Sequence, residues 1–83
     1  MVAFYKKGDT KKVGFTASKK IGNAVKRNFA KRRLRAAFLE LQPHLNQGYY
    51  IFVAKKEILT QEFTKVQRDM HFALEKLNAI KKQ

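Results

Sequence analysis

The sequence predicts a small α+β domain in which two helices pack on one side of a β-sheet, in the chain order strand, strand, helix, strand, helix. Three observations predict this class. Apolar residues recur with a period of two in residues 13–18, as in a half-buried strand, and at spacings of three and four in residues 24–41 and 63–80, as in amphipathic helices. A near-continuous apolar run fills residues 49–54. The 83 residues leave room for one core, so we predict a single domain over residues 1–83.

The amino-terminal part of the chain predicts two strands. Residues 1–5 are apolar and aromatic, and residues 13–18 alternate between apolar and small or polar side chains, which indicates a strand with one buried face. Gly8-Asp9, between the two segments, is typical of a turn. We therefore expect residues 6–12 to form the loop of an antiparallel hairpin.

The first helix is predicted to begin after Asn23, whose side chain can accept a hydrogen bond from an exposed backbone N–H, and to run to about Leu41. Gly22 marks the bend before this helix, and Pro43 lies in the loop that follows it. One arc of the helix is apolar and would face the core. It consists of Ala30, Leu34, Ala37, Phe38 and Leu41.

The second half of the chain predicts one strand and one helix. The apolar run at residues 49–54 lies between Gly48 and Lys55 and predicts a central strand that is buried on both faces. Thr60 is the predicted cap of the last helix. The apolar residues of that helix are Phe63, Val66, Met70, Ala73, Leu74, Leu77 and Ile80.

The charge of the chain is strongly positive and unevenly distributed. Nineteen Lys and Arg residues face six Asp and Glu residues, which gives a formal charge of +13. The segment between Lys19 and Arg35 carries eight basic residues and no acidic residue. A compact domain with this charge repels itself, and its one-sided distribution is typical of a surface that binds phosphate groups.

The predicted first helix repeats like charges at a spacing of four, at Arg27, Lys31 and Arg35. Each such pair costs about 0.2–0.5 kcal/mol of helix stability, whereas a solvated helix face usually mixes signs. Arginine can also bind phosphate with two hydrogen bonds and stack on bases. The pattern favours RNA or DNA over a membrane surface, which would need a wider apolar stripe. A helix-turn-helix is not favoured, because a strand precedes the basic helix.

Residues for catalysis by the polypeptide itself are not apparent, so we predict no catalytic residue, no metal site and no bound cofactor. His44 and His71 lack metal-ligand spacing and are interpreted as a loop histidine and an exposed or half-buried helix histidine. The carboxylates are scattered, and the glycines form no phosphate loop. The absence of cysteine excludes disulfides and suits a cytoplasmic location. No apolar run approaches the roughly 20 residues of a membrane span.

One segment of the chain resembles the signature of the bacterial ribonuclease P protein family. It consists of residues 13–28 (VGFTASKKIGNAVKRN), followed by Lys31-Arg32 and Arg35. That signature runs from a strand through Ser-Lys-Lys, Gly and Ala-Val to Arg-Asn, Lys-Arg and Arg at fixed spacing. The similarity is long, and it continues through the second half of the chain to cover residues 2–81.

The resemblance implies an accessory protein subunit of ribonuclease P, in which the RNA subunit is the catalyst. That RNA removes the 5′ leader of precursor tRNA by hydrolysis, with magnesium ions bound mainly by RNA. The implied partners are ribonuclease P RNA and precursor tRNA. The residues that the motif assigns to RNA binding are Lys19, Lys20, Lys26, Arg27, Asn28, Lys31, Arg32 and Arg35. The alternative, which composition alone favours equally, is a ribosomal or other structural RNA-binding protein.

The resemblance further implies a left-handed crossover through the basic helix and a cleft on the sheet for the single-stranded leader. Phe4 matches an aromatic position of that cleft, where it would stack on a base; the alternative is a core residue of its strand. Family members usually begin with a further helix and strand ahead of Val2, so we expect one cleft wall to be missing. Without this cover, residues 1–4 would expose an apolar edge that favours self-association.

Overall fold

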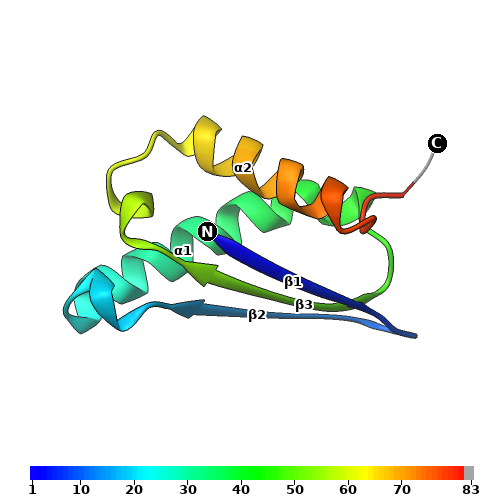
Figure 1. Cartoon of the computed structure of the whole chain (residues 1–83), viewed down its shortest axis with the longest axis horizontal. Coiled ribbons are helices and arrows are strands. Elements are labelled where there is room, and N and C mark those ends of the chain that lie inside the picture. Colours follow the sequence, from blue (N-terminus) through cyan, green and yellow to red (C-terminus); the bar gives the residue numbers. More distant parts are fainter. Residues whose placement is uncertain (82–83) are drawn as a thin grey trace.

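The computed structural model describes residues 1–81 and has the predicted α+β architecture (Figure 1). In chain order the elements are β1 (Val2–Lys7), β2 (Lys11–Ala17), the 3-10 helix η1 (Lys19–Ile21), α1 (Ala24–Leu41), the 3-10 helix η2 (Gln42–His44), β3 (Gly48–Ala54), the 3-10 helix η3 (Lys56–Leu59) and α2 (Phe63–Lys76). None of the helices in residues 1–81 is long and apolar enough to cross a membrane.

The central strand of the sheet is β3, with β1 on one side and β2 on the other. Since β1 runs antiparallel to β3 and β2 runs parallel to it, the predicted hairpin of the first two strands is wrong. Lys7 and Lys11 both align with Gly48, from opposite sides, because residues 8–10 carry the chain across the end of β3. This order gives the most apolar strand hydrogen-bonding partners on both edges, whereas a β1–β2 hairpin would leave β3 at an exposed edge.

A parallel crossover connects β2 through α1 to β3, as the resemblance implied. Parallel strands need such a long connection, because a tight turn can join only antiparallel neighbours. The left-handed sense of this crossover stays a prediction.

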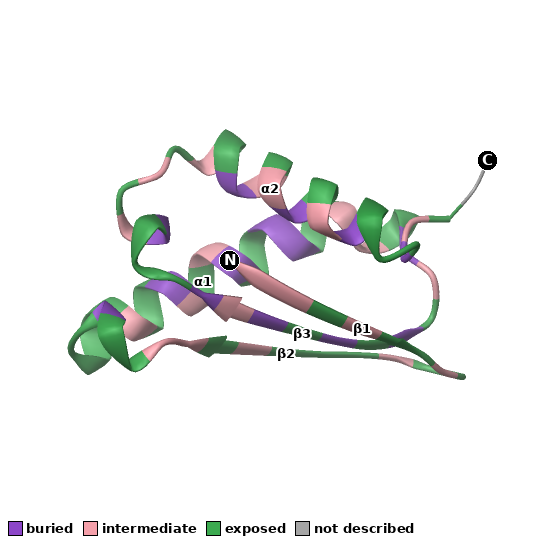
Figure 2. Ribbon diagram, in the orientation of Figure 1, coloured by how far each residue is buried: buried purple, intermediate pink, exposed green. Residues whose placement is uncertain are grey.

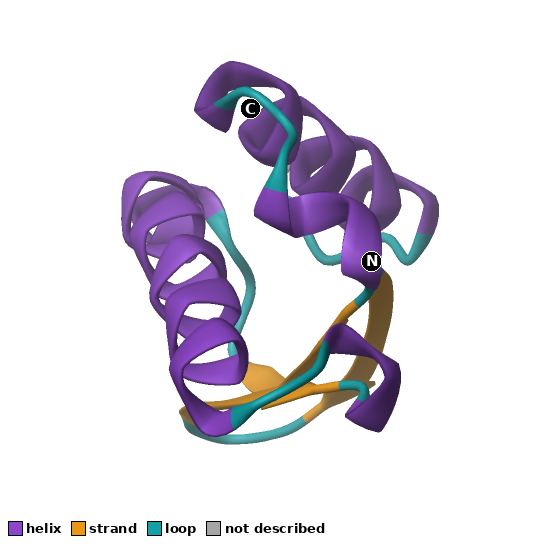
Figure 3. Ribbon diagram, turned by 90° about the vertical axis from the view of Figure 1, so that its left-hand side faces the viewer, coloured by secondary structure: helices purple, strands orange, loops and turns teal. Residues whose placement is uncertain are grey.

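Both helices pack on the same face of the sheet, as predicted (Figure 3). The residues of β3 therefore alternate, with Tyr50 and Phe52 buried and Tyr49 and Ile51 exposed (Figure 2). The prediction that this strand is buried on both faces is wrong, because no element of residues 1–81 covers the second face. A continuous apolar run is compatible with either arrangement, and only the packing of the helices distinguishes them.

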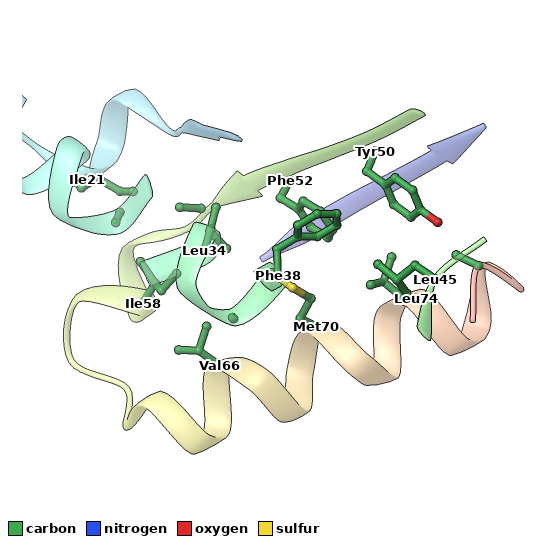
Figure 4. Close-up of a cluster of buried hydrophobic side chains, with 14 residues drawn as sticks. Ile21, Leu34, Phe38, Leu45, Tyr50, Phe52, Ile58, Val66, Met70 and Leu74 are labelled. Carbon is green, nitrogen blue, oxygen red and sulfur yellow. The ribbon is translucent and has the colours of Figure 1, made fainter. Parts of the chain in front are cut away.

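Phe38 lies at the centre of an aromatic core between α1 and the sheet (Figure 4). Its ring centroid lies 5.8 Å from that of Phe15, 5.7 Å from that of Tyr50 and 5.6 Å from that of Phe52. These edge-to-face contacts add to the stabilisation from burying apolar area. The core of this small domain therefore depends on one helix residue that contacts three aromatic rings of the sheet.

The predicted apolar faces of both helices are confirmed apart from Leu77, which is 37% exposed and lies beyond the end of α2. The buried residues of α1 are Ala30, Leu34, Ala37 and Phe38. Those of α2 are Val66, Met70 and Leu74. Ile80 lies beyond the end of α2, where it forms an isolated β-bridge with the buried Leu45. This bridge fastens the residues after α2 to the loop before β3.

The two α-helices begin differently. Asn23 caps α1 as predicted, since its Oδ1 accepts a hydrogen bond from the backbone N–H of Lys26 at 3.0 Å. The prediction that Thr60 caps the last helix is wrong. Glu62 occupies the cap position of α2 without a side-chain hydrogen bond, and the Thr60 hydroxyl instead donates to the Glu57 carbonyl of η3. Thr60 follows the last residue of η3 and lies two residues before the cap of α2, and a hydroxyl can close one helical segment as well as open the next.

Gly48→Ala is expected to destabilise the domain by about 1–3 kcal/mol. Gly48 has a φ of +154°, and a Cβ atom there would lie 2.5 Å from the Lys6 carbonyl oxygen and 2.6 Å from the Tyr5 ring. A side chain would therefore push β1 away from β3. Urea denaturation followed by circular dichroism measures the change in the free energy of unfolding.

Gly14→Ala is the matched control for this prediction. Gly14 lies exposed in β2, and a Cβ atom there would meet no atom within 4 Å. Since glycine weakens a strand interior, this variant should be neutral or slightly stabilised, within about 1 kcal/mol. Equal losses of stability in the two variants would contradict a steric requirement at Gly48.

Candidate nucleic-acid interface

The predicted RNA-binding residues come from η1 and the first twelve residues of α1, beside the end of β2. The Ser18 hydroxyl accepts a hydrogen bond from the Lys20 backbone N–H at 3.3 Å and so begins η1. Gly22, with a φ of +123°, then turns the chain into α1, which Asn23 caps. These local signals place the lysines of η1 next to the first turns of the helix.

Six of the eight predicted residues line two neighbouring hollows on α1. The first hollow lies between α1 and the end of β2, and Lys19, Arg27, Asn28 and Lys31 line it. The second lies further along the helix and is lined by Asn28, Lys31, Arg32 and Arg35, with Val25. We call these six residues (Lys19, Arg27, Asn28, Lys31, Arg32 and Arg35) the basic face. Lys20 and Lys26 are exposed but line neither hollow.

The basic face has five cations and no counter-charge of its own. Within residues 1–81 no carboxylate lies at salt-bridge distance from any of the five; the contact found at that distance joins His71 and Glu75. Arg27 and Lys31 are half-buried, so water screens the repulsion between them less than it would at a fully exposed site. Binding of an external anion would remove this repulsion.

The arginines of α1 have two different roles. The Arg35 guanidinium lies 5.6 Å from the Phe15 ring centroid. This cation–π contact holds the guanidinium of the exposed Arg35 against the edge of the sheet. Arg33 lies on the other flank, where its Nη1 donates to the Ile58 carbonyl oxygen at 2.8 Å and its guanidinium lies 5.6 Å from the Phe29 ring centroid. Arg33 therefore ties α1 to η3 and is not part of the basic face.

The uncovered side of the sheet is a second candidate surface, which we call the open face. Paired residues of neighbouring strands point to the same side of a sheet, so the register places the side chains of this face in three rows. From β1 across β3 to β2 the rows are Lys6–Tyr49–Lys12, Phe4–Ile51–Gly14 and Val2–Val53–Thr16. An apolar and aromatic centre is thus bordered at one end by two lysines.

Phe4 is 55% exposed in the middle row of the open face, which excludes the alternative of a core residue. Tyr49 and Ile51, 43% and 50% exposed, also belong to this surface, although we predicted them to be buried. The alternation that would have shown their exposure was hidden, because both sides of β3 carry apolar residues. β1 is an edge strand, as expected, and self-association through it stays a prediction.

The chemistry available on these two surfaces is that of cations, amides and aromatic rings. His44 is exposed in η2, and His71 is exposed on α2, where its Nδ1 lies 4.0 Å from Oε2 of Glu75. Residues 1–81 contain no group of three or more His, Cys, Asp or Glu that could hold a metal ion. Cations and exposed rings together suit phosphate groups and unpaired bases.

Fold and surfaces together define a class: a small α+β domain with a polycationic helix face and an open aromatic sheet face, the features of an RNA-binding protein. The profile of the family described as Ribonuclease P matches residues 1–78. The chain therefore belongs to the ribonuclease P protein family, as the resemblance of its basic helix predicted.

Two curated relatives are named ribonuclease P protein component. That of Nitratiruptor sp. is 41% identical over 80 residues, which are 96% of this chain and 73% of the relative. That of Caulobacter vibrioides is 49% identical over 72 residues, which are 84% of this chain and 48% of the relative. The chain thus spans between about half and about three-quarters of the length of these two relatives.

The fold is also similar to that of solved structures. The RNase P protein of Staphylococcus aureus superposes with a TM-score of 0.78 at 23% identity, over 95% of this chain and 75% of that protein. At this level of identity the likeness shows the fold alone, and it agrees with the α+β architecture predicted from the sequence.

Proposed function

We propose that this chain is the protein subunit of a ribonuclease P, in which its basic face binds the catalytic RNA and its open face binds the 5′ leader of precursor tRNA. The observation that carries the proposal is the gathering of five cations and Asn28 in two adjoining hollows, which no carboxylate of residues 1–81 lines. Membership of the ribonuclease P protein family supports the RNA partners and the removal of the leader.

The basic face suits the backbone of a folded RNA. Its two hollows share Asn28 and Lys31 and so offer two neighbouring places for phosphate groups. Arg27 borders one hollow and Arg32 the other, and a guanidinium fork can donate two parallel hydrogen bonds to one phosphate. The Asn28 amide can donate to phosphate or accept from a 2′-hydroxyl, which DNA lacks.

The open face suits an unpaired strand. Bases that are free of a duplex can stack on exposed rings, and each stacked base contributes about 1–3 kcal/mol. Phe4 and Tyr49 supply rings on neighbouring strands, and Lys6 and Lys12 flank Tyr49 in its row. A duplex hides the faces of its bases, so this surface would favour the leader over the paired body of the tRNA.

In this proposal the hydrolysis and its magnesium ions belong to the RNA subunit. The chain contributes a charge of +13, which offsets the repulsion between two polyanions that must approach each other. Magnesium ions also reduce that repulsion. The contribution of the protein should therefore be greatest where magnesium is scarce.

Reconstitution tests the proposed function. The protein is mixed with a bacterial ribonuclease P RNA and a precursor tRNA, and leader removal is measured over a range of magnesium concentrations. We expect leader removal to be faster than with the RNA alone, by a factor that shrinks as magnesium rises. Equal rates with and without the protein at every magnesium concentration would overturn the proposal.

Phe4→Ala is expected to weaken the binding of precursor tRNA to the reconstituted holoenzyme by about 5- to 10-fold, because one stacking platform is lost. Binding of mature tRNA, which has no leader, should stay the same. Equilibrium binding of the two RNAs measures the difference.

Phe72→Ala is the control for this variant. Phe72 is 58% exposed on α2, on the helical side of the molecule, so its removal should leave both affinities unchanged. If Phe4→Ala lost the same affinity for precursor tRNA as for mature tRNA, or if both variants lost the same affinity, Phe4 would not contact the leader.

A further inference from the structure

A third cationic site lies at the end of the sheet opposite to the basic face. The turn between β1 and β2, the loop before β3 and the residues after α2 meet at this end (Figure 1). They surround a notch of about 660 Å³, which we define by its lining residues Tyr5, Lys7, Asn46, Gln47, Asn78 and Lys81. None of these residues belongs to the basic face or to the rows of the open face.

Hydrogen bonds between distant segments hold the walls of the notch. The Tyr5 hydroxyl donates to the Gln47 carbonyl oxygen at 3.0 Å. Asn46 donates from its side chain to the Asn78 carbonyl oxygen at 3.3 Å and from its backbone to the Ala79 carbonyl oxygen at 2.7 Å. Asn78 has a φ of +59°, a left-handed conformation that asparagine tolerates. The loop before β3 and the chain after α2 therefore form one connected wall.

The notch gathers positive charge. Lys7 and Lys81 line it, and both are exposed. Lys11 lies close by, where its Nζ donates to the Gln42 carbonyl oxygen at 2.7 Å. Burial lowers the pKa of Lys11, and the neighbouring Lys81 ammonium lowers it further. The ammonium groups of Lys11 and Lys81 are thus close enough to repel one another.

Within residues 1–81 no carboxylate lies at salt-bridge distance from Lys7 or Lys81. Asp9 is exposed in the turn and does not line the notch. Glu75 borders an adjoining hollow that shares Asn46, Asn78 and Lys81 with the notch, and its Oε2 lies 4.0 Å from Nδ1 of His71. The five cations of the basic face likewise make no salt bridge in the described part of the chain.

We propose that the notch binds a phosphodiester group of RNA between Lys7 and Lys81. The two ammonium groups supply the charge. The side chains of Gln47 and Asn78 make no hydrogen bond within residues 1–81, so their amides can donate to the phosphate oxygens. This inference rests on the proposed function and adds to it a contact at the far end of the sheet.

The notch lies at the end of the sheet where an RNA strand bound to the open face would leave that face. The row Lys6–Tyr49–Lys12 is the last row at this end, and Lys7 follows it directly in β1. Lys7 pairs with the buried Gly48, so its side chain lies on the helix-covered side of the sheet, and the Tyr49 ring lies over Gly8 between the two sides. A leader that passes Tyr49 and continues around this end of the sheet would therefore reach the notch with its next phosphates. The catalytic RNA is the other source of the same chemical group, and the experiment separates the two.

The test compares two double variants that each remove two positive charges. Lys7→Gln with Lys81→Gln empties the notch of charge. Lys56→Gln with Lys65→Gln is the matched control, because both lysines are exposed and line neither the notch nor the basic face. The affinity of each protein variant for ribonuclease P RNA is measured over a range of salt concentrations. The affinity of each reconstituted holoenzyme is measured over the same range for a precursor tRNA with a long leader and for one with a short leader. Thermal melting checks that both variants fold.

We expect the notch variant to bind at least one of these RNAs roughly 5- to 30-fold more weakly than the control variant, with a salt slope smaller by about 1–2. A loss confined to the long leader assigns the phosphodiester to the leader, and a loss with ribonuclease P RNA assigns it to that RNA. Losses no greater than those of the control for all three RNAs would overturn the site. Failure of the proposed function is distinct, since the unmodified protein would then bind none of them.

Discussion

Phe38→Ala should remove at least about a quarter of the free energy of unfolding of the domain. The side chain is 2% exposed and contacts three aromatic rings, so truncation leaves a cavity between α1 and the sheet. Removing a buried phenylalanine costs about 3–5 kcal/mol. A domain of this length has about 4–12 kcal/mol of stability in total. Circular dichroism during urea or thermal denaturation measures the loss.

Phe72→Ala serves as the control for this variant too, since it removes the same side chain from an exposed position of α2. Its effect should stay within about 0.5 kcal/mol, apart from the contact between Lys76 and the Phe72 ring. If Phe38→Ala unfolded no more readily than Phe72→Ala, the aromatic cluster would not be the core on which the fold depends.

Arg27→Ala combined with Arg32→Ala should weaken binding to ribonuclease P RNA by roughly 30-fold near physiological salt, and the slope of log affinity against log salt should shrink by about 1–2. The two arginines border different hollows of the basic face, so the double variant removes one phosphate contact from each. Neither side chain forms a salt bridge within residues 1–81, so the stability of the fold should change little. Filter binding or fluorescence anisotropy at several salt concentrations measures both quantities.

The control for this prediction is Lys56→Ala combined with Lys65→Ala, which changes the net charge by the same amount at exposed sites on η3 and α2. It separates a contact at the basic face from a general effect of net charge. An unchanged salt slope in the arginine variant would move the RNA contact to another surface.

The basic face was predictable because all but one of its residues belong to one helix. The Asn23 cap, the apolar arc and the cations at a spacing of four are local signals, and helical geometry converts spacing directly into position on a surface. For Lys20 and Lys26, which are exposed, RNA binding stays a prediction. They have the right charge and the right place in the sequence, but they line neither hollow.

The sheet was less predictable because its pairing joins distant segments. The turn signal at Gly8-Asp9 correctly predicted a reversal of the chain, but a turn signal does not show whether the flanking strands pair with each other or on two sides of a third strand. The same holds for β3. Its apolar character correctly predicted the central position and incorrectly predicted that both faces are buried.

The sequence by itself determined the two helices, the apolar side of each, the basic face and the resemblance to the ribonuclease P protein family, because these features depend on residues within a few turns of one another. Only the tertiary structure decided that β3 lies between β1 and β2, that Phe4, Tyr49 and Ile51 share an open face, and that Lys7 meets Lys81 at a notch. These features depend on which distant segments meet. That choice is made by the burial of the whole core, to which every element contributes.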